Sequence, residues 1–215
     1  MPKFSGPADF AAHFGVSASV LEKFETYAEL LRRWQSAVNL VADTSLDDMW
    51  RRHFADSAQL LNLAPEAKFW LDLGSGGGFP GMVIAIMLVD QPGAKVMLIE
   101  SRARKCAFLA EVARATGAPV EIRQSRVEST RIPPNVVAPD IVTARALAPL
   151  DRLLELAAPW FGPTTRGLFL KGSQAREEIK AAERRWTFHV KLAKSQTDDS
   201  GRIVEIRSPS LWGKS

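Results

Sequence analysis

The chain has 215 residues, 46% of them hydrophobic and 24% charged, which is typical of a globular protein with one sizeable core. Its formal net charge of +4 permits a nucleic-acid partner without requiring one. The single cysteine, Cys106, excludes an internal disulfide, the N-terminal segment lacks the apolar run of a signal peptide, and no apolar stretch approaches the length of a membrane span. We therefore expect a cytoplasmic protein without a membrane segment.

The first part of the chain has a helical pattern, from about residue 8 to residue 62. Ser19 and Glu22 have the spacing of a capping box, and an apolar stripe at helical spacing begins at Leu21. Ser45 with Asp48 predicts a further helix start. We expect residues 1–64 to form a helical extension packed on a catalytic domain of residues 65–215.

After Pro65 short apolar runs alternate with helical segments. Apolar runs such as FWLDL and VMLI are typical of strands buried on both faces, and therefore of a parallel sheet between helices. The predicted strands are Lys68–Leu73, Lys95–Glu100, Pro119–Arg123, Asp140–Thr143 and Gly167–Lys171. The predicted helices between them are Gly81–Val89, Ala103–Thr116 and Leu150–Trp160.

The C-terminal part predicts a helix near Ser173–Arg185 and then an antiparallel hairpin. Its strands are Thr187–Ala193 and Arg202–Arg207, and a turn-rich stretch separates them. The expected fold class is α/β, a Rossmann-like, seven-stranded and mostly parallel sheet with a helical N-terminal cap.

The strongest functional signal is the segment DLGSGGGFPG, residues 72–81, between a predicted strand and a predicted helix. Glycines such as Gly74, Gly76 and Gly78 allow a tight turn and a close approach of a ligand to the backbone. The loop lies at the carboxyl end of the first strand, where open α/β sheets bind ligands.

Two acidic residues indicate which nucleotide this loop binds. Asp72 directly precedes the glycines, where a carboxylate suits the positive charge of S-adenosylmethionine better than a pyrophosphate. Glu100 ends the second strand, where an acid can accept hydrogen bonds from ribose hydroxyls. An adenosyl cofactor is therefore favoured, and NAD is the second possibility.

The sequence resembles the RsmG (GidB) family of bacterial 16S rRNA methyltransferases over nearly its whole length. Motifs outside the generic loop carry the resemblance; they are Trp34 with VNL (38–40), RHFADS (52–57), Lys105 with Phe108-Leu109, QSRVE (124–128), ARA (144–146), LKG (170–172) and Gly201-Arg202. The resemblance implies a methyltransferase fold, S-adenosylmethionine as cofactor, and methylation of N7 of guanine 527 in the 530 loop of 16S rRNA. It also implies cofactor contacts at Gly74, Phe79, Glu100, Val127, Glu128 and Arg145.

The chemistry expected after the fourth strand fits such an acceptor. Residues 142–149 contain neither the Asn/Asp-Pro-Pro-aromatic motif of amine methylation nor a nucleophilic cysteine. Guanine N7 has a free lone pair, so its methylation needs no general base. Arg145 is the predicted catalytic residue, because a guanidinium there can hold the guanine or a phosphate.

Basic residues near the predicted crevice are candidates for RNA contacts. They are Arg104, Lys105, Arg126, Lys171 and Arg202. Lys171 is equally well explained as a solvated lysine at a strand end. His53 and Asp56 share a helix face and are expected to fix helix packing, and no histidine has metal-ligand spacing, so we expect no metal.

The expected partner is 16S rRNA, within the small ribosomal subunit or its precursor. We expect the protein to be a monomer. Two alternatives stay open: an NAD-dependent oxidoreductase, and a non-catalytic RNA-binding module on a methyltransferase fold.

Overall fold

Seven strands form one sheet in the order β3-β2-β1-β4-β5-β7-β6. The computed structural model describes residues 2, 4–132 and 137–212. The first five strands in this order, β3, β2, β1, β4 and β5, pair in parallel with their neighbours. Strand β7 pairs antiparallel with both β5 and β6. The strands are Phe69–Leu73 (β1), Lys95–Glu100 (β2), Val120–Gln124 (β3), Ile141–Arg145 (β4), Arg166–Lys171 (β5), Trp186–Lys194 (β6) and Arg202–Leu211 (β7).

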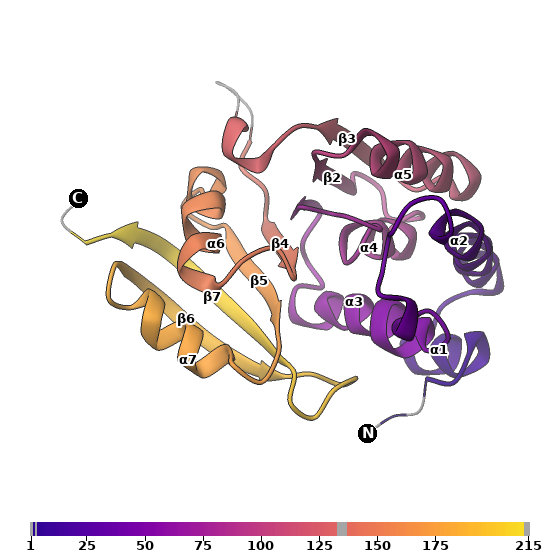
Figure 1. The fold of residues 1–215 in the computed structure, drawn as a ribbon, viewed down its shortest axis with the longest axis horizontal. Helices are drawn as coiled ribbons and strands as arrows, with labels where there is room; N and C mark the ends of the chain where they lie inside the picture. The colour runs from indigo at the N-terminus through magenta and orange to yellow at the C-terminus, as the bar shows by residue number, and fades with distance from the viewer. Residues whose placement is uncertain (1, 3, 133–136, 213–215) are drawn as a thin grey trace.

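Helices cover both faces of the sheet (Figure 1). One apolar cluster joins α1, α2, α4 and α5 to one face, and a second joins α6 and α7 to the other. The α-helices are Pro7–Phe14 (α1), Ala18–Gln35 (α2), Asp56–Ala58 (α3), Gly81–Met87 (α4), Ala103–Thr116 (α5), Leu150–Ala157 (α6) and Ala175–Ala182 (α7). The expected mostly parallel α/β sheet with a helical N-terminal cap is confirmed.

The N-terminal segment differs in detail from the continuous helical pattern expected. Helix α2 begins after Ser17, whose side chain accepts a hydrogen bond from the Val20 amide, so the prediction of a cap at Ser19 was wrong. Ser45 ends a short 3₁₀ turn, Asp43–Ser45, instead of starting a helix. A π-helical stretch, Trp50–Ala55, leads into α3 and a 3₁₀ stretch, Gln59–Leu63.

Residues from both expected domains share one apolar cluster. Phe10 and Phe24 belong to the same cluster as Trp70 of β1 and Leu98 of β2, and all four are fully buried. The boundary at residue 64 stays a prediction.

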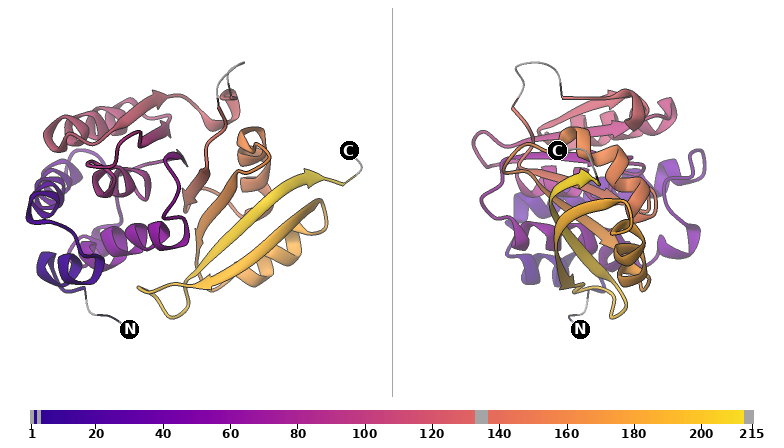
Figure 2. Two further views of the ribbon diagram at one scale, coloured as in Figure 1. Left: turned by 180° about the vertical axis from the view of Figure 1, so that it is seen from behind. Right: turned by 90° about the vertical axis from the view of Figure 1, so that its left-hand side faces the viewer.

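The turn of the β6–β7 hairpin lies against the N-terminal helices (Figure 2). Arg51 donates to the Thr197 carbonyl at 2.8 Å, and Gln59 accepts from the Gln196 amide at 2.8 Å. These bonds bring the first and last parts of the chain together at the carboxyl edge of the parallel strands. Among the described residues, no helix has the length and apolarity to cross a membrane.

Candidate functional site

Three adjoining cavities lie at the carboxyl edge of the parallel strands. The first cavity, of about 410 Å³, is bordered by the glycine loop after β1, by Glu100 at the end of β2 and by Val127 after β3. The second cavity, of about 670 Å³, lies between the same loop, His53 and Arg145. This edge is where strand order reverses around β1 and β4, the position at which α/β sheets bind ligands.

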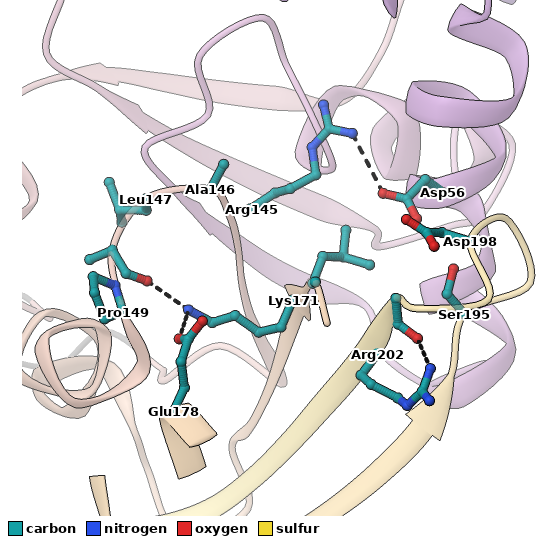
Figure 3. A pocket seen from close by; sticks show the side chains of 14 residues that line it. Asp56, Arg145, Ala146, Leu147, Pro149, Lys171, Glu178, Ser195, Asp198 and Arg202 are labelled. Carbon is teal, nitrogen blue, oxygen red and sulfur yellow. Dashed lines mark hydrogen bonds and ion pairs between the residues drawn. The ribbon is translucent and has the colours of Figure 1, made fainter. Parts of the chain in front are cut away.

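The third cavity, of about 570 Å³, lies between the β4–α6 loop and the terminal hairpin (Figure 3). Ala146 lines all three cavities. Its φ of 52° lies in the left-handed region, which a residue with a Cβ rarely adopts and which is concentrated at functional sites. The three cavities therefore meet at one backbone position after β4.

The glycines of the loop have two different roles. Gly74 and Gly76 have φ of 69° and 57° and border the first two cavities. Gly78 lines none of the three cavities, because it faces the protein interior: an added Cβ would overlap Tyr27 and lie 2.8 Å from the Cβ of Met82. This glycine therefore serves packing, and a cofactor contact at Gly78 stays a prediction.

Glu100 is 7% exposed and its carboxylate has a fixed orientation. One oxygen accepts from the Gly76 amide at 2.9 Å, and the other accepts from the Arg102 amide at 2.7 Å. The oxygen bonded to Arg102 also accepts from the Ser101 hydroxyl at 3.5 Å, so the oxygen bonded to Gly76 is the one that retains a lone pair for a further donor. The carboxylate thus joins the glycine loop to the start of α5 and borders the first cavity.

Val127 and Glu128 complete the wall of the first cavity. Val127 is 7% exposed and offers an apolar surface, whereas Glu128 is exposed and pairs with Arg152 at 3.3 Å. A cavity with an oriented carboxylate on one side and an apolar wall on the other suits a nucleoside.

Asp72 lies beneath the glycine loop and borders none of the three cavities. It is 1% exposed, accepts from the Thr143 hydroxyl at 3.0 Å and accepts from the Gly81 amide at 3.2 Å. Burial raises the pKa of its carboxyl group to about 6. The expectation that Asp72 directly faces a cationic ligand was wrong, because the start of α4 and β4 covers it.

Arg145, at the end of β4, is only 19% exposed and is held by the N-terminal helices. Its guanidinium donates to the Arg52 carbonyl at 2.8 Å and to His53 Nδ1 at 3.0 Å, and it lies 3.5 Å from a carboxylate oxygen of Asp56. It also lies over the ring of Phe79, 5.0 Å from the ring centroid. Arg145 is therefore part of a largely buried polar network and not a solvated side chain.

His53 is neutral in this arrangement. Burial and then the charge of Arg145 lower the pKa of its imidazole to about 3. Arginine can only donate, so Nδ1 is the acceptor, and Nε2–H donates to the Ser45 hydroxyl at 2.8 Å. His53 therefore holds Arg145 and leaves no ring nitrogen to act as a base.

Asp56 joins Arg145 to the terminal hairpin. One of its oxygens accepts from the Thr197 hydroxyl at 2.8 Å and from the Gln59 amide at 2.9 Å, and the other faces Arg145. Burial raises the pKa of Asp56, while Arg145 opposes that rise. His53 and Asp56 thus fix packing, as expected, but through Arg145.

The five predicted RNA contacts lie in different environments. Lys171 donates to Glu178 at 2.7 Å and to the Ala148 carbonyl at 2.6 Å, with 9% of its side chain exposed (Figure 3). Lys171 is therefore not a solvated lysine, because an ion pair holds its charge; it lines the third cavity, and its contact with RNA stays a prediction. Arg202 lines the third cavity and donates to backbone carbonyls of its own turn, at 2.6 and 2.8 Å.

Arg104, Lys105 and Arg126 lie at the rim of the first cavity and of a smaller one beside it. Arg102 lines the same two cavities, and Arg52 lines the second cavity next to them. Among the described residues, none of these five cations, Arg52, Arg102, Arg104, Lys105 and Arg126, forms an ion pair. The rim therefore has positive charge available for an anionic partner. Within the same part of the chain, no group of acidic, histidine or cysteine side chains suits a metal ion.

The hairpin turn is the part of the site that sequence reasoning missed. Thr197 and Asp198 line the second cavity, and Asp198 also lines the third. The sequence identified their segment only as a connection between two strands. The one available signal was the pair of acidic residues, 198 and 199, in the turn before Arg202.

Comparisons with solved structures show methyltransferase folds. A putative O-methyltransferase from Klebsiella pneumoniae superposes with a TM-score of 0.58 at 16% identity, covering 89% of this chain and 90% of that one. The O-methyltransferase from Bacillus cereus, solved in complex with SAH, also gives 0.58 at 16% identity, covering 86% and 91%. At such identities the likeness concerns the fold alone.

Sequence comparisons identify the family. A protein from Parvibaculum lavamentivorans named ribosomal RNA small subunit methyltransferase G is 48% identical over 207 residues, which is 96% of this chain and 91% of that protein. Its namesake from Rhodospirillum centenum is 49% identical over 92% of this chain and 88% of that protein. The family model GidB, rRNA small subunit methyltransferase G, matches residues 20–202. The chain therefore belongs to the GidB family of rRNA small subunit methyltransferases.

Proposed function

We propose that this protein transfers the methyl group of S-adenosylmethionine to N7 of a guanine in 16S rRNA, which the family resemblance implies to be guanine 527. The observation that carries the proposal is the first cavity. There Glu100, oriented by two backbone amides, faces the space between the glycine loop and Val127. Family membership supports ribosomal RNA as the substrate.

The residues present fit this cofactor. Glu100 would accept hydrogen bonds from the ribose hydroxyls, and Val127 would pack against the adenine. Gly74 and Gly76 leave the backbone accessible beside the cavity, because neither bears a side chain there. When bound, S-adenosylmethionine supplies an activated methyl group on a sulfonium.

The acceptor side of the site suits a nucleophile that needs no deprotonation. His53 is the one histidine among the residues that line the three cavities, and both its ring nitrogens are engaged. Guanine N7 attacks through its own lone pair and becomes cationic, so a base would have no proton to remove. The chain's contribution is positioning, which is a large part of the rate when the donor is already activated.

Arg145 is the residue we assign to positioning at the junction of the cavities. Its guanidinium borders the second and third cavities and is fixed by His53, Asp56 and Phe79. A fixed guanidinium can donate to guanine O6 or to a phosphate. The unpaired cations of the rim would bind the phosphates around the target nucleotide.

The direct test is transfer of labelled methyl groups to small ribosomal subunits purified from a strain lacking the enzyme. We expect the label at N7 of one guanine. A label on another base would contradict the proposed acceptor, and naked 16S rRNA offered in parallel tests whether the assembled subunit is the substrate. We also propose that the protein acts in the cytoplasm, where the ribosomes are, and as a monomer, which sedimentation tests.

A further inference from the structure

A methyltransferase specific for guanine must recognise more than N7. Adenine also has an N7 acceptor, whereas the N1–H and the N2 amino group of guanine are two adjacent donors that adenine lacks. An ionised carboxylate is the side chain that accepts from two such donors at once. A carboxylate at the second and third cavities with an oxygen left to accept could therefore distinguish guanine from adenine.

Three carboxylates line these two cavities. Asp56 is engaged by Arg145, Thr197 and Gln59. Glu178 lines the third cavity but not the second, and its charge is paired: Lys171 at 2.7 Å and the Leu150 amide at 2.8 Å both donate to its Oε2, although its Oε1 is left to accept. Two carboxylates therefore stabilise the walls of the site.

The third carboxylate, Asp198, differs from both. Its Oδ1 accepts from the Ser200 amide at 2.8 Å and from the Ser200 hydroxyl at 2.7 Å, which orients the group. No donor within the described part of the chain bonds to its Oδ2, and the residue is exposed where the second and third cavities meet. The bonds from Ser200 also lower its pKa, so the group is ionised at neutral pH.

The turn that bears Asp198 is fixed to the rest of the site. Thr197 donates to Asp56, which in turn faces Arg145, and Gln59 accepts from the Gln196 amide. Asp198 is thus held at a defined position beside Asp56, which faces Arg145, and all three line the second and third cavities (Figure 3).

We propose that Asp198 selects guanine as the methyl acceptor: its Oδ2, with two lone pairs left, would accept hydrogen bonds from both N1–H and the N2 amino group. This inference rests on the proposed function. Arg145 would then donate to O6 of guanine, and Asp198 would accept from the neighbouring N1–H and N2 amino group. Adenine has a donor, its N6 amino group, in place of O6 and an acceptor, N1, in place of N1–H, so it would fit neither residue. A base without the N2 amino group loses one of the two bonds to the carboxylate.

The test compares guanine with inosine at the target nucleotide in reconstituted small subunits. Inosine retains N7, O6 and N1–H but lacks the N2 amino group. With the wild-type enzyme we expect inosine to lower kcat/KM by about tenfold to a hundredfold, the value of a hydrogen bond to a charged group. Asp198→Asn keeps the Ser200 bonds but places an NH₂ group at one carboxylate oxygen, so it should lower kcat/KM for guanine and bring the guanine-to-inosine ratio near one.

Asp199→Asn is the matched control, since it removes the same charge one residue along and lines none of the three cavities. Asp199→Asn should prefer guanine to inosine as strongly as the wild type does. Both Asp198→Asn and Asp199→Asn should bind S-adenosylmethionine with wild-type affinity in calorimetry. Equal rates on guanine and inosine by the wild-type enzyme, or undiminished discrimination by Asp198→Asn, would overturn this inference alone. Failure of the wild type to methylate guanine N7 would overturn the proposed function as well.

Discussion

Arg145 donates a hydrogen bond to Nδ1 of His53, with 3.0 Å between the two nitrogens. The two residues are 92 positions apart, and their contact joins the end of β4 to the π-helical stretch of the N-terminal cap. The guanidinium also faces Asp56 and the ring of Phe79. The residue assigned to substrate positioning is therefore also a link between the cap and the sheet.

Replacing Arg145 by alanine should lower both stability and activity. The change leaves Nδ1 of His53 and an oxygen of the mostly buried Asp56 without a partner, which typically costs about 1–3 kcal/mol of unfolding free energy. Loss of a fixed positioning contact should lower methylation by roughly a hundredfold. Chemical denaturation and methyl transfer to small subunits measure the two effects.

Two further variants separate charge from geometry at this position. Arg145→Lys should restore little activity, because an ammonium cannot reproduce the planar fork that bonds His53 and the Arg52 carbonyl together. Arg207→Ala is the control, since Arg207 is about half exposed, and neither it nor its partner Glu205 lines any of the three cavities. It should change stability by less than about 1 kcal/mol. Full activity of Arg145→Ala would contradict the assignment.

Glu100→Ala should weaken the binding of S-adenosylmethionine by about 1–3 kcal/mol, because it removes charge-assisted hydrogen bonds to the ribose. It also removes the acceptor of the Gly76 and Arg102 amides, so the loop is less well ordered. Titration calorimetry measures the affinity. Glu177→Gln on α7 is the control and should bind normally, and unchanged affinity of Glu100→Ala would place the cofactor elsewhere.

The glycine loop allows a comparison of two substitutions within three residues. At Gly78 an added Cβ would overlap Tyr27 and crowd Met82, so Gly78→Ala should unfold at markedly lower denaturant concentration. At Gly76 the nearest atoms to an added Cβ are 3.8 and 3.9 Å away. Gly76→Val should therefore fold but lose cofactor binding, because its side chain enters the cavity.

Any side chain at Gly76 or Gly78 also adds backbone strain, because both glycines have a positive φ, and a control variant must measure this strain separately. Gly117, at the end of α5, has φ of 68° and no atom within 4 Å of an added Cβ. Gly117→Ala thus measures the conformational penalty alone, about 1 kcal/mol. A Gly78→Ala variant no less stable than Gly117→Ala would contradict the packing role of Gly78.

The sequence predicted the sheet well, because its strands are continuous apolar runs with few competing patterns. It predicted the N-terminal cap only coarsely, since nothing local distinguishes the π-helical turn that brings His53 to Arg145. The ion pair of Lys171 could not be foreseen either, because Glu178 faces it from a different element. Asp198 was missed because its position against the cavities depends on contacts between the hairpin turn and residues 51–59.

The depressed pKa of His53 predicts a contribution to acid sensitivity. Its folded pKa is about 3, whereas an unfolded histidine titrates near 6.5, so the unfolded state binds the proton more readily between these values. The contribution is fully present above about pH 6.5 and is lost as the pH falls toward 3. Between pH 7 and pH 5 this single group should cost about 2 kcal/mol of unfolding free energy.

Asp72 opposes this trend, because its raised pKa of about 6 makes the folded state retain a proton from roughly pH 4 to 6. The informative quantity is therefore the difference in unfolding free energy between the wild type and His53→Gln, in which the contribution of Asp72 cancels. This difference should shrink by about 2 kcal/mol between pH 7 and pH 5. A wild type and His53→Gln with parallel stability curves would show that His53 is not held neutral beside Arg145.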